Sequence, residues 1–213
     1  GSGQGYIALA AGSIKNATDE PDSTIASAAQ GALPFTVTPG SPDPQVLILH
    51  THATETYQTW DTPVYDPDFT ARTKDTTLNM CAVGEAMTKV LNDAGITTLH
   101  DTTLHDSPSY TESYARSAQT ARRYLEEYPS IKVVLDVHRD AMESGDARVR
   151  PLTTLDGQPT AQVMIIAGCN DGGTVQLPNW RLNLCFAANT VQQAVRAGQY
   201  AAKALAALFG GSV

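Results

Sequence analysis

Short apolar runs alternate with amphipathic segments along most of this chain. Residues 46–50 and 131–137 carry mainly apolar side chains, which predicts two buried strands. Residues 76–93 and 111–127 have apolar positions at helical spacing, with Asp75 as the expected N-cap of the first helix. Strands that are apolar on both faces and alternate with helices are typical of α/β proteins. The pattern therefore predicts a three-layer α/β/α sandwich around a mostly parallel sheet.

The remaining predicted elements are a short strand, a hairpin that turns at Asp156-Gly157, and a long C-terminal helix. They cover residues 96–99, residues 148–152 with 157–166, and residues 180–208. Residues 1–45 are rich in Gly, Ala, Ser and Pro, so we expect an irregular N-terminal arm there. Residues 46–213 are then expected to form a single domain.

Composition excludes several classes of function. The chain of 213 residues has a formal charge of −8 and no basic run, which argues against a nucleic-acid partner. It has no run of roughly 18 apolar residues that would span a bilayer. Gly1-Ser2-Gly3 resembles a cloning remnant, so any membrane anchor is expected to have been removed. Cys81, Cys169 and Cys185 lack CxxC spacing and are predicted to be buried free thiols.

Two polar motifs directly follow the predicted strands, and they carry the candidate chemistry. His50-Thr51-His52-Ala53-Thr54-Glu55 follows the first strand, and Asp136-Val137-His138-Arg139-Asp140 ends the second. Parallel strands bring their carboxyl ends to one sheet edge, where sites gather. His52, Glu55 and His138 are the expected ligands of a Zn²⁺ ion that leaves a fourth position for water, which indicates amide or ester hydrolysis. Glu55 could alternatively act as a base, or hydrogen-bond to a metal ligand without binding the ion itself.

The neighbours of these three residues each have a functional and a structural interpretation. His50 is expected to support a ligand, with direct metal binding as the alternative. Asp136 either orients an imidazole or is an ordinary carboxylate at a strand end. Arg139, with Asp140 beside it, either clamps a substrate carboxylate or forms a structural ion pair. Tyr110 either reaches the cleft or packs on a helix. The sequence has no GxSxG elbow, no P-loop and no GxGxxG motif.

The two motifs resemble the stage II sporulation protein P family, cell-wall hydrolases related to zinc N-acetylmuramoyl-L-alanine amidases. The resemblance runs from about Gly5 to Phe209. Further segments that agree are Arg72, Asn79, Val83-Gly84-Glu85, His105-Asp106-Ser107-Pro108-Ser109-Tyr110 and Pro178-Asn179-Trp180. It implies that residues 46–213 are an amidase-like catalytic domain with a phosphorylase/hydrolase-like fold.

The resemblance also implies an activity and a setting. The expected reaction is zinc-dependent cleavage between N-acetylmuramic acid and L-alanine in peptidoglycan during engulfment. Cleavage within the stem peptide, or binding of peptidoglycan without catalysis, are the alternatives. The implied partners are glycan, stem peptide, and a septal complex with a lytic transglycosylase and a membrane protein. The implied location is extracytoplasmic, membrane-anchored, at the septum between mother cell and forespore.

One departure from the family concerns the catalytic base. The family usually carries a Glu-x-Gly motif near its end, and this Glu is the expected base. Here the sequence passes directly from Asn183–Asn189 to Thr190–Ala194. We therefore expect that several dozen residues are missing near 188–190. Asp171 is the remaining candidate for the base.

Overall fold

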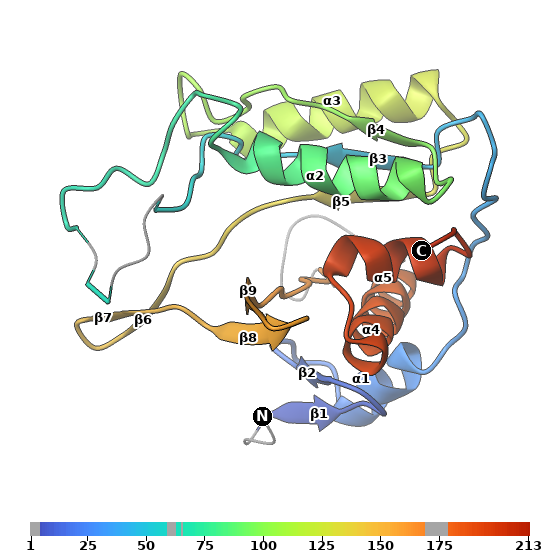
Figure 1. The fold of residues 1–213 in the computed structure, drawn as a ribbon. Helices are drawn as coiled ribbons and strands as arrows, with labels where there is room; N and C mark the ends of the chain where they lie inside the picture. Colours follow the sequence, from blue (N-terminus) through green and yellow to red (C-terminus); the bar gives the residue numbers. More distant parts are fainter. Residues whose placement is uncertain (1–4, 59–62, 65, 169–178) are drawn as a thin grey trace. The chain divides into compact units, whose positions relative to one another are not determined.

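The computed structural model describes residues 5–58, 63–64, 66–168 and 179–213 of the chain. Two compact units are present, one of residues 37–151 and one of residues 1–36 with 152–213. Helices and strands both occur in the described residues, which confirms the predicted α/β class (Figure 1).

A parallel three-stranded sheet forms the centre of the unit of residues 37–151. Its strands are β3 (Val46–Leu49), β4 (Thr98–His100) and β5 (Val133–Asp136), in the order β4-β3-β5. Both pairings are parallel, as predicted. All four residues of β3 are buried, which explains why the central strand is apolar throughout.

Helices α2 (Met80–Asp93) and α3 (Ser113–Glu127) lie against opposite faces of this sheet. Leu49 belongs to the apolar cluster that includes residues of α3. The next residue, His50, lies against Gly84 of α2, as expected because successive side chains of a strand point to opposite faces. This unit thus has a helix on each face of its sheet, while the larger three-layer sandwich stays a prediction.

The start of α2 differs from the prediction. The helix begins at Met80, and its N-cap is Asn79, whose side chain accepts a hydrogen bond from the Cys81 N–H at 2.9 Å. Asp75 instead accepts hydrogen bonds from the backbone and hydroxyl of Thr77. Asp75 is therefore wrong as the cap, because its side chain closes a local turn before the helix begins.

The unit of residues 1–36 and 152–213 is built from hairpins and helices. Its elements are β1 (Tyr6–Ala8), β2 (Ser13–Lys15), α1 (Asp22–Ala29), β8 (Leu152–Leu155), β9 (Gln158–Ala161), α4 (Trp180–Ala197) and α5 (Ala201–Leu208). Helices α1 and α4 pack through a buried cluster that includes Ile25 and Leu184. The segment 1–45, expected to be irregular, thus contains two strands and a helix.

Two further predictions are corrected by the structure. The turn at Asp156-Gly157 is confirmed, but its strands are only β8 and β9. Arg148 pairs instead within a second hairpin, β6 (Met142–Ser144) with β7 (Ala147–Val149). The long C-terminal helix is broken into α4 and α5 at Gly198, which has a φ of 58°. Across the described ranges, no helix has the length and apolar character needed to traverse a membrane.

Helix α4 runs without interruption through the junction where a segment is expected to be missing. Residues 188–190 lie inside the continuous helix Trp180–Ala197. The side-chain amide of Asn189 donates to the Cys185 carbonyl and the Thr190 hydroxyl to the Phe186 carbonyl, both at 2.9 Å. The chain is therefore ordinary helix at residues 188–190, and the loss of a segment there stays a prediction. Cys185 and Cys81 are buried free thiols, as predicted, and Cys169 lies outside the described residues.

Candidate metal centre

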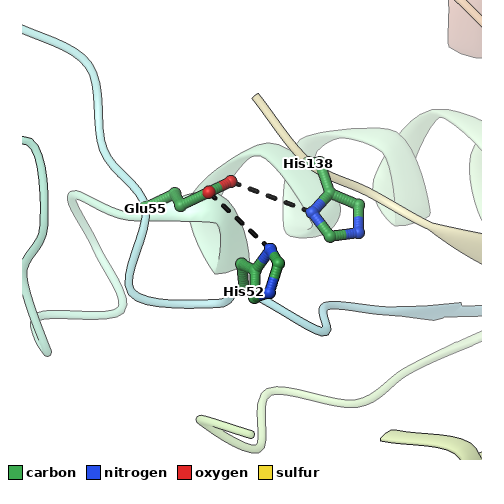
Figure 2. A group of neighbouring side chains, drawn as sticks. All are labelled: His52, Glu55 and His138. Atoms are coloured by element: carbon green, nitrogen blue, oxygen red, sulfur yellow. Dashed lines mark ion pairs between the residues drawn. The ribbon is translucent and has the colours of Figure 1, made fainter. Parts of the chain in front are cut away.

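The carboxyl ends of β3 and β5 bring His52, Glu55 and His138 together. His52 and Glu55 lie on a turn after β3, which the hydrogen bond from the Glu55 N–H to the His52 carbonyl closes at 3.1 Å. His138 follows β5, the parallel neighbour of β3. Figure 2 shows the carboxylate of Glu55 facing both imidazole rings, with one oxygen paired to each.

The spacing of these side chains fits a small cation. Glu55 Oε1 lies 3.8 Å from His52 Nδ1, and Glu55 Oε2 lies 3.8 Å from His138 Nδ1. One ligand atom from each residue lies within 4.8 Å of the others. Bonds of about 2.1 Å in tetrahedral zinc place neighbouring donors about 3.4 Å apart, so small side-chain movements would complete the site. Two imidazoles and a carboxylate are also a donor set that zinc accepts.

Asp136 determines how His138 presents its ring. His138 Nε2 lies 2.9 Å from Asp136 Oδ2 and donates to it, so Nδ1 is the nitrogen that faces Glu55. The Thr51 backbone N–H and hydroxyl hold Asp136 in turn, at 2.8 and 2.6 Å. Hydrogen bonds to Asp136 and Glu55 raise the pKa of His138 to about 9. Burial acts to raise the pKa of Asp136, but hydrogen bonds from His138 and Thr51 lower it overall.

His52 is held by Ser113 and by two tyrosine rings. Its Nε2 lies 3.1 Å from Ser113 Oγ, at the start of α3. The Tyr110 ring stacks on His52 at 4.5 Å between centroids, and Tyr114 meets its edge at 5.2 Å. Burial lowers the pKa of His52, which favours the neutral ring that a metal requires.

Glu55 and Arg139 are linked through the main chain. Glu55 Oε2 accepts a hydrogen bond from the Arg139 backbone N–H at 3.3 Å. Burial acts to raise the pKa of Glu55, but His138 and Arg139 lower it overall, so the group is a carboxylate. The Arg139 guanidinium donates from Nη2 to the Ala71 carbonyl at 3.1 Å, and its buried Nε has no hydrogen-bond partner among the residues that the structure describes. Asp140 is exposed and accepts from the Ala141 N–H at 2.8 Å.

His50 lies on the α2 side of the sheet and contacts a different set of groups. Its Nδ1 donates to the Val137 carbonyl at 2.9 Å, and its Nε2 lies 2.9 Å from His100 Nε2. Burial lowers the pKa of His50 to about 4, so the ring is neutral and His100 is the donor. His50 therefore supports the backbone next to His138 instead of pointing at the three candidate ligands. Asp171 lies outside the described residues.

Sequence reasoning assigned no role to three residues that contact the centre. Thr51 lies between the two histidines of the first motif, so its position was a usable signal. Arg72 and Ser113 come from a loop and from a helix start, where no spacing pattern connects them to His52 or Glu55.

Comparisons with known proteins agree on one family. The family model described as "Stage II sporulation protein P" matches residues 10–205. A Bacillus subtilis (strain 168) protein of the same name is 27% identical over 129 residues, which make up 58% of this chain and 30% of that protein. The matched part thus spans less than a third of the relative's length. No solved structure gives a significant match.

Proposed function

Because this chain belongs to the stage II sporulation protein P family, we propose that it is a zinc-dependent peptidoglycan hydrolase. The bond cleaved is the amide between N-acetylmuramic acid and L-alanine, and the fold that supports the site is the three-layer sandwich of zinc amidases. The observation that carries this proposal is the convergence of His52, Glu55 and His138 at the ends of two parallel strands.

The surrounding residues prepare this donor set for zinc. When bound, the ion would supply Lewis acidity toward a carbonyl oxygen and acidify a water molecule. Asp136 accepts the Nε2–H of His138, and Ser113 is placed to accept that of His52, so Nδ1 of each ring faces Glu55. The second proton of His138, which the raised pKa retains in the metal-free chain at neutral pH, would be displaced on zinc binding. The hydrogen bond from the Arg139 N–H keeps Glu55 ionised and oriented.

Arg139 is our candidate for binding the substrate. Its Nε is buried without a partner in the described part of the chain, and its own backbone N–H bonds the candidate ligand Glu55. A buried donor of this kind calls for an acceptor. A stem peptide offers carbonyl and carboxylate oxygens, and a guanidinium binds carboxylates well. We therefore assign Arg139, with the adjacent Asp140, to the peptide side of the scissile bond, and Tyr110 to the wall of the cleft beside His52.

A non-catalytic peptidoglycan-binding module is the second candidate. The observation that favours it is the continuous helix at residues 188–190, where the family's Glu-bearing segment would be inserted. If the chain is a hydrolase without that segment, Asp171 is the remaining candidate for the catalytic base.

Whether the chain is a hydrolase or a binding module, we propose that the whole protein is membrane-anchored outside the cytoplasm at the sporulation septum. There it would act with a lytic transglycosylase and a membrane protein.

Metal content and product analysis test the proposal together. The chain is loaded with Zn²⁺, its metal is measured by mass spectrometry, and it is incubated with dye-labelled peptidoglycan. We expect about one Zn²⁺ per chain and soluble products with a new L-alanine amino terminus. New termini within the stem peptide would show an endopeptidase instead. Zinc and peptidoglycan binding without release would support the binding module. The variant with His52→Ala and His138→Ala is the control, and release by this variant would exclude the zinc mechanism.

A further inference from the structure

We propose that Arg72 is a positioning residue for the metal centre, which fixes the Glu55 carboxylate directly and the His52 ring through Tyr110. This role rests on the proposed zinc site. Arg72 lies in the long loop between β3 and α2, seventeen positions after Glu55 in the sequence. Its guanidinium contacts groups from two other parts of the chain, the turn after β3 and the loop that precedes α3.

The main chain places Arg72 directly opposite Glu55. The two residues form an antiparallel bridge. On either side of it, the Thr56 N–H donates to the Ala71 carbonyl at 3.1 Å and the Thr73 N–H to the Thr54 carbonyl at 2.7 Å. Residues facing each other in such a bridge have side chains within easy reach. The approach of Arg72 to Glu55 therefore follows from the path of the loop.

The guanidinium joins Glu55 to a second carboxylate. Nη2 lies 3.5 Å from Glu55 Oε1, and Nη1 lies 2.8 Å from Asp106 Oδ2. The Asp106 side chain is fully buried, and the Thr54 hydroxyl also donates to it, at 2.6 Å. Asp106 neutralises the charge of Arg72. The guanidinium can consequently orient Glu55 without placing an unbalanced positive charge beside a cation site.

The same guanidinium supports the second ligand through a ring. Its carbon Cζ lies 5.1 Å from the Tyr110 ring centroid, within cation–π range. The Tyr110 ring stacks on His52 with an interplanar angle of 18°. Arg72 thus restrains two of the three candidate ligands, Glu55 by direct contact and His52 through the Tyr110 ring.

A purely structural role would have a different consequence. If Arg72 only neutralises buried Asp106, then Arg72→Gln would harm the fold by leaving Asp106 without a cation, and Asp106→Asn would repair that harm. If Arg72 positions the ligands, the repaired fold would still bind zinc weakly. The variant with both substitutions separates the two roles.

The experiment compares zinc affinity with metal-free stability in the wild type, Arg72→Gln, Arg72→Lys, and Arg72→Gln with Asp106→Asn. Arg122→Gln, an exposed arginine of α3, is the control. Zinc affinity is measured by competition with a chromogenic chelator, and thermal midpoints are measured in EDTA.

We expect Arg72→Gln to weaken zinc binding by about 10- to 100-fold, the usual effect of removing a residue that orients a ligand. Arg72→Lys should recover part of this loss, and Arg122→Gln should bind like the wild type. The double variant should regain the thermal midpoint but not the affinity. Two results would overturn the role of Arg72 and leave the metal centre in place. One is an unchanged zinc affinity in Arg72→Gln, and the other is recovery of both the thermal midpoint and the zinc affinity in the double variant. A wild-type chain that binds no zinc would overturn the metal centre and this role together.

Discussion

The metal-free chain should lose stability as the pH rises from about 6.5 to about 9, and His138 should be the cause. In the folded chain its ring bonds Asp136 through Nε2 at 2.9 Å and faces Glu55 through Nδ1 at 3.8 Å. Both carboxylates favour the protonated imidazole and raise the pKa of His138 to about 9 from 6.5. The unfolded chain has no such partners, so it releases this proton at lower pH.

The sign and size of the effect follow from linkage. A raised pKa contributes stability that is complete below the unfolded pKa and is lost as the pH rises through the folded pKa. At about 1.4 kcal/mol per pKa unit, a pKa of about 9 in place of 6.5 corresponds to about 3.5 kcal/mol. The imidazole is 28% exposed, and solvent screens part of the interaction. We therefore expect a loss of about 2 kcal/mol.

Urea unfolding in EDTA, followed by circular dichroism from pH 6 to 9.5, measures this loss. The matched variant is His138→Gln, which keeps a polar side chain but cannot take up the proton. Other titrating groups are common to both chains and largely cancel in the difference. The stability of the wild type relative to the variant should fall across the window. A difference that stays constant from pH 6.5 to 9 would refute the charge assignment of His138.

Three other predictions concern the packing and the ligands of the site. Gly84→Ala should lower the free energy of unfolding by about 1–3 kcal/mol in spite of alanine's better helix propensity, because a Cβ there would lie 2.5 Å from His50 Nε2; an unchanged urea midpoint would contradict this packing. In a Cys169→Ser chain, native Cys81 should resist a thiol reagent at pH 8, because burial raises its pKa to about 11. Rapid labelling before unfolding would show that it is accessible. His52→Ala should abolish the rise of the thermal midpoint on adding Zn²⁺, whereas His50→Ala should mainly lower the midpoint measured in EDTA; the reverse pattern would exchange their roles.

The sequence was sufficient to predict which strands carry the candidate ligands. An apolar run followed by polar motifs marks a buried parallel strand, and parallel strands share the edge at which they end. β3 and β5 are neighbours in the sheet, so the residues after them meet. His52, Glu55 and His138 could be grouped on this basis although His138 is far from the other two in the sequence. More than eighty positions separate Glu55 from Arg139, the residue directly after His138.

The residues that orient these ligands were not predictable in the same way. Ser113, which contacts His52, is the first residue of α3, but the N-cap Glu112 makes no side-chain hydrogen bond, so no capping motif in the sequence marks this helix start. The error at Asp75 has a different origin, since two residue types suited to capping lie four positions apart and either could close the turn. Arg72 meets Glu55 through the path of a long loop, which no periodicity in the sequence describes.

The contrast between His50 and His52 shows how a turn assigns chemistry that a strand pattern leaves open. Strand alternation would point both rings to one face, but β3 ends at Leu49 and the turn begins at Thr51. Thr51 fixes this change of direction, because its N–H and hydroxyl both bind Asp136. His50 keeps the direction of the strand and bonds the Val137 carbonyl, while His52 turns toward Glu55. The two histidines of the motif therefore act on the same neighbourhood from different sides, one through the backbone before His138 and one as a candidate ligand beside it.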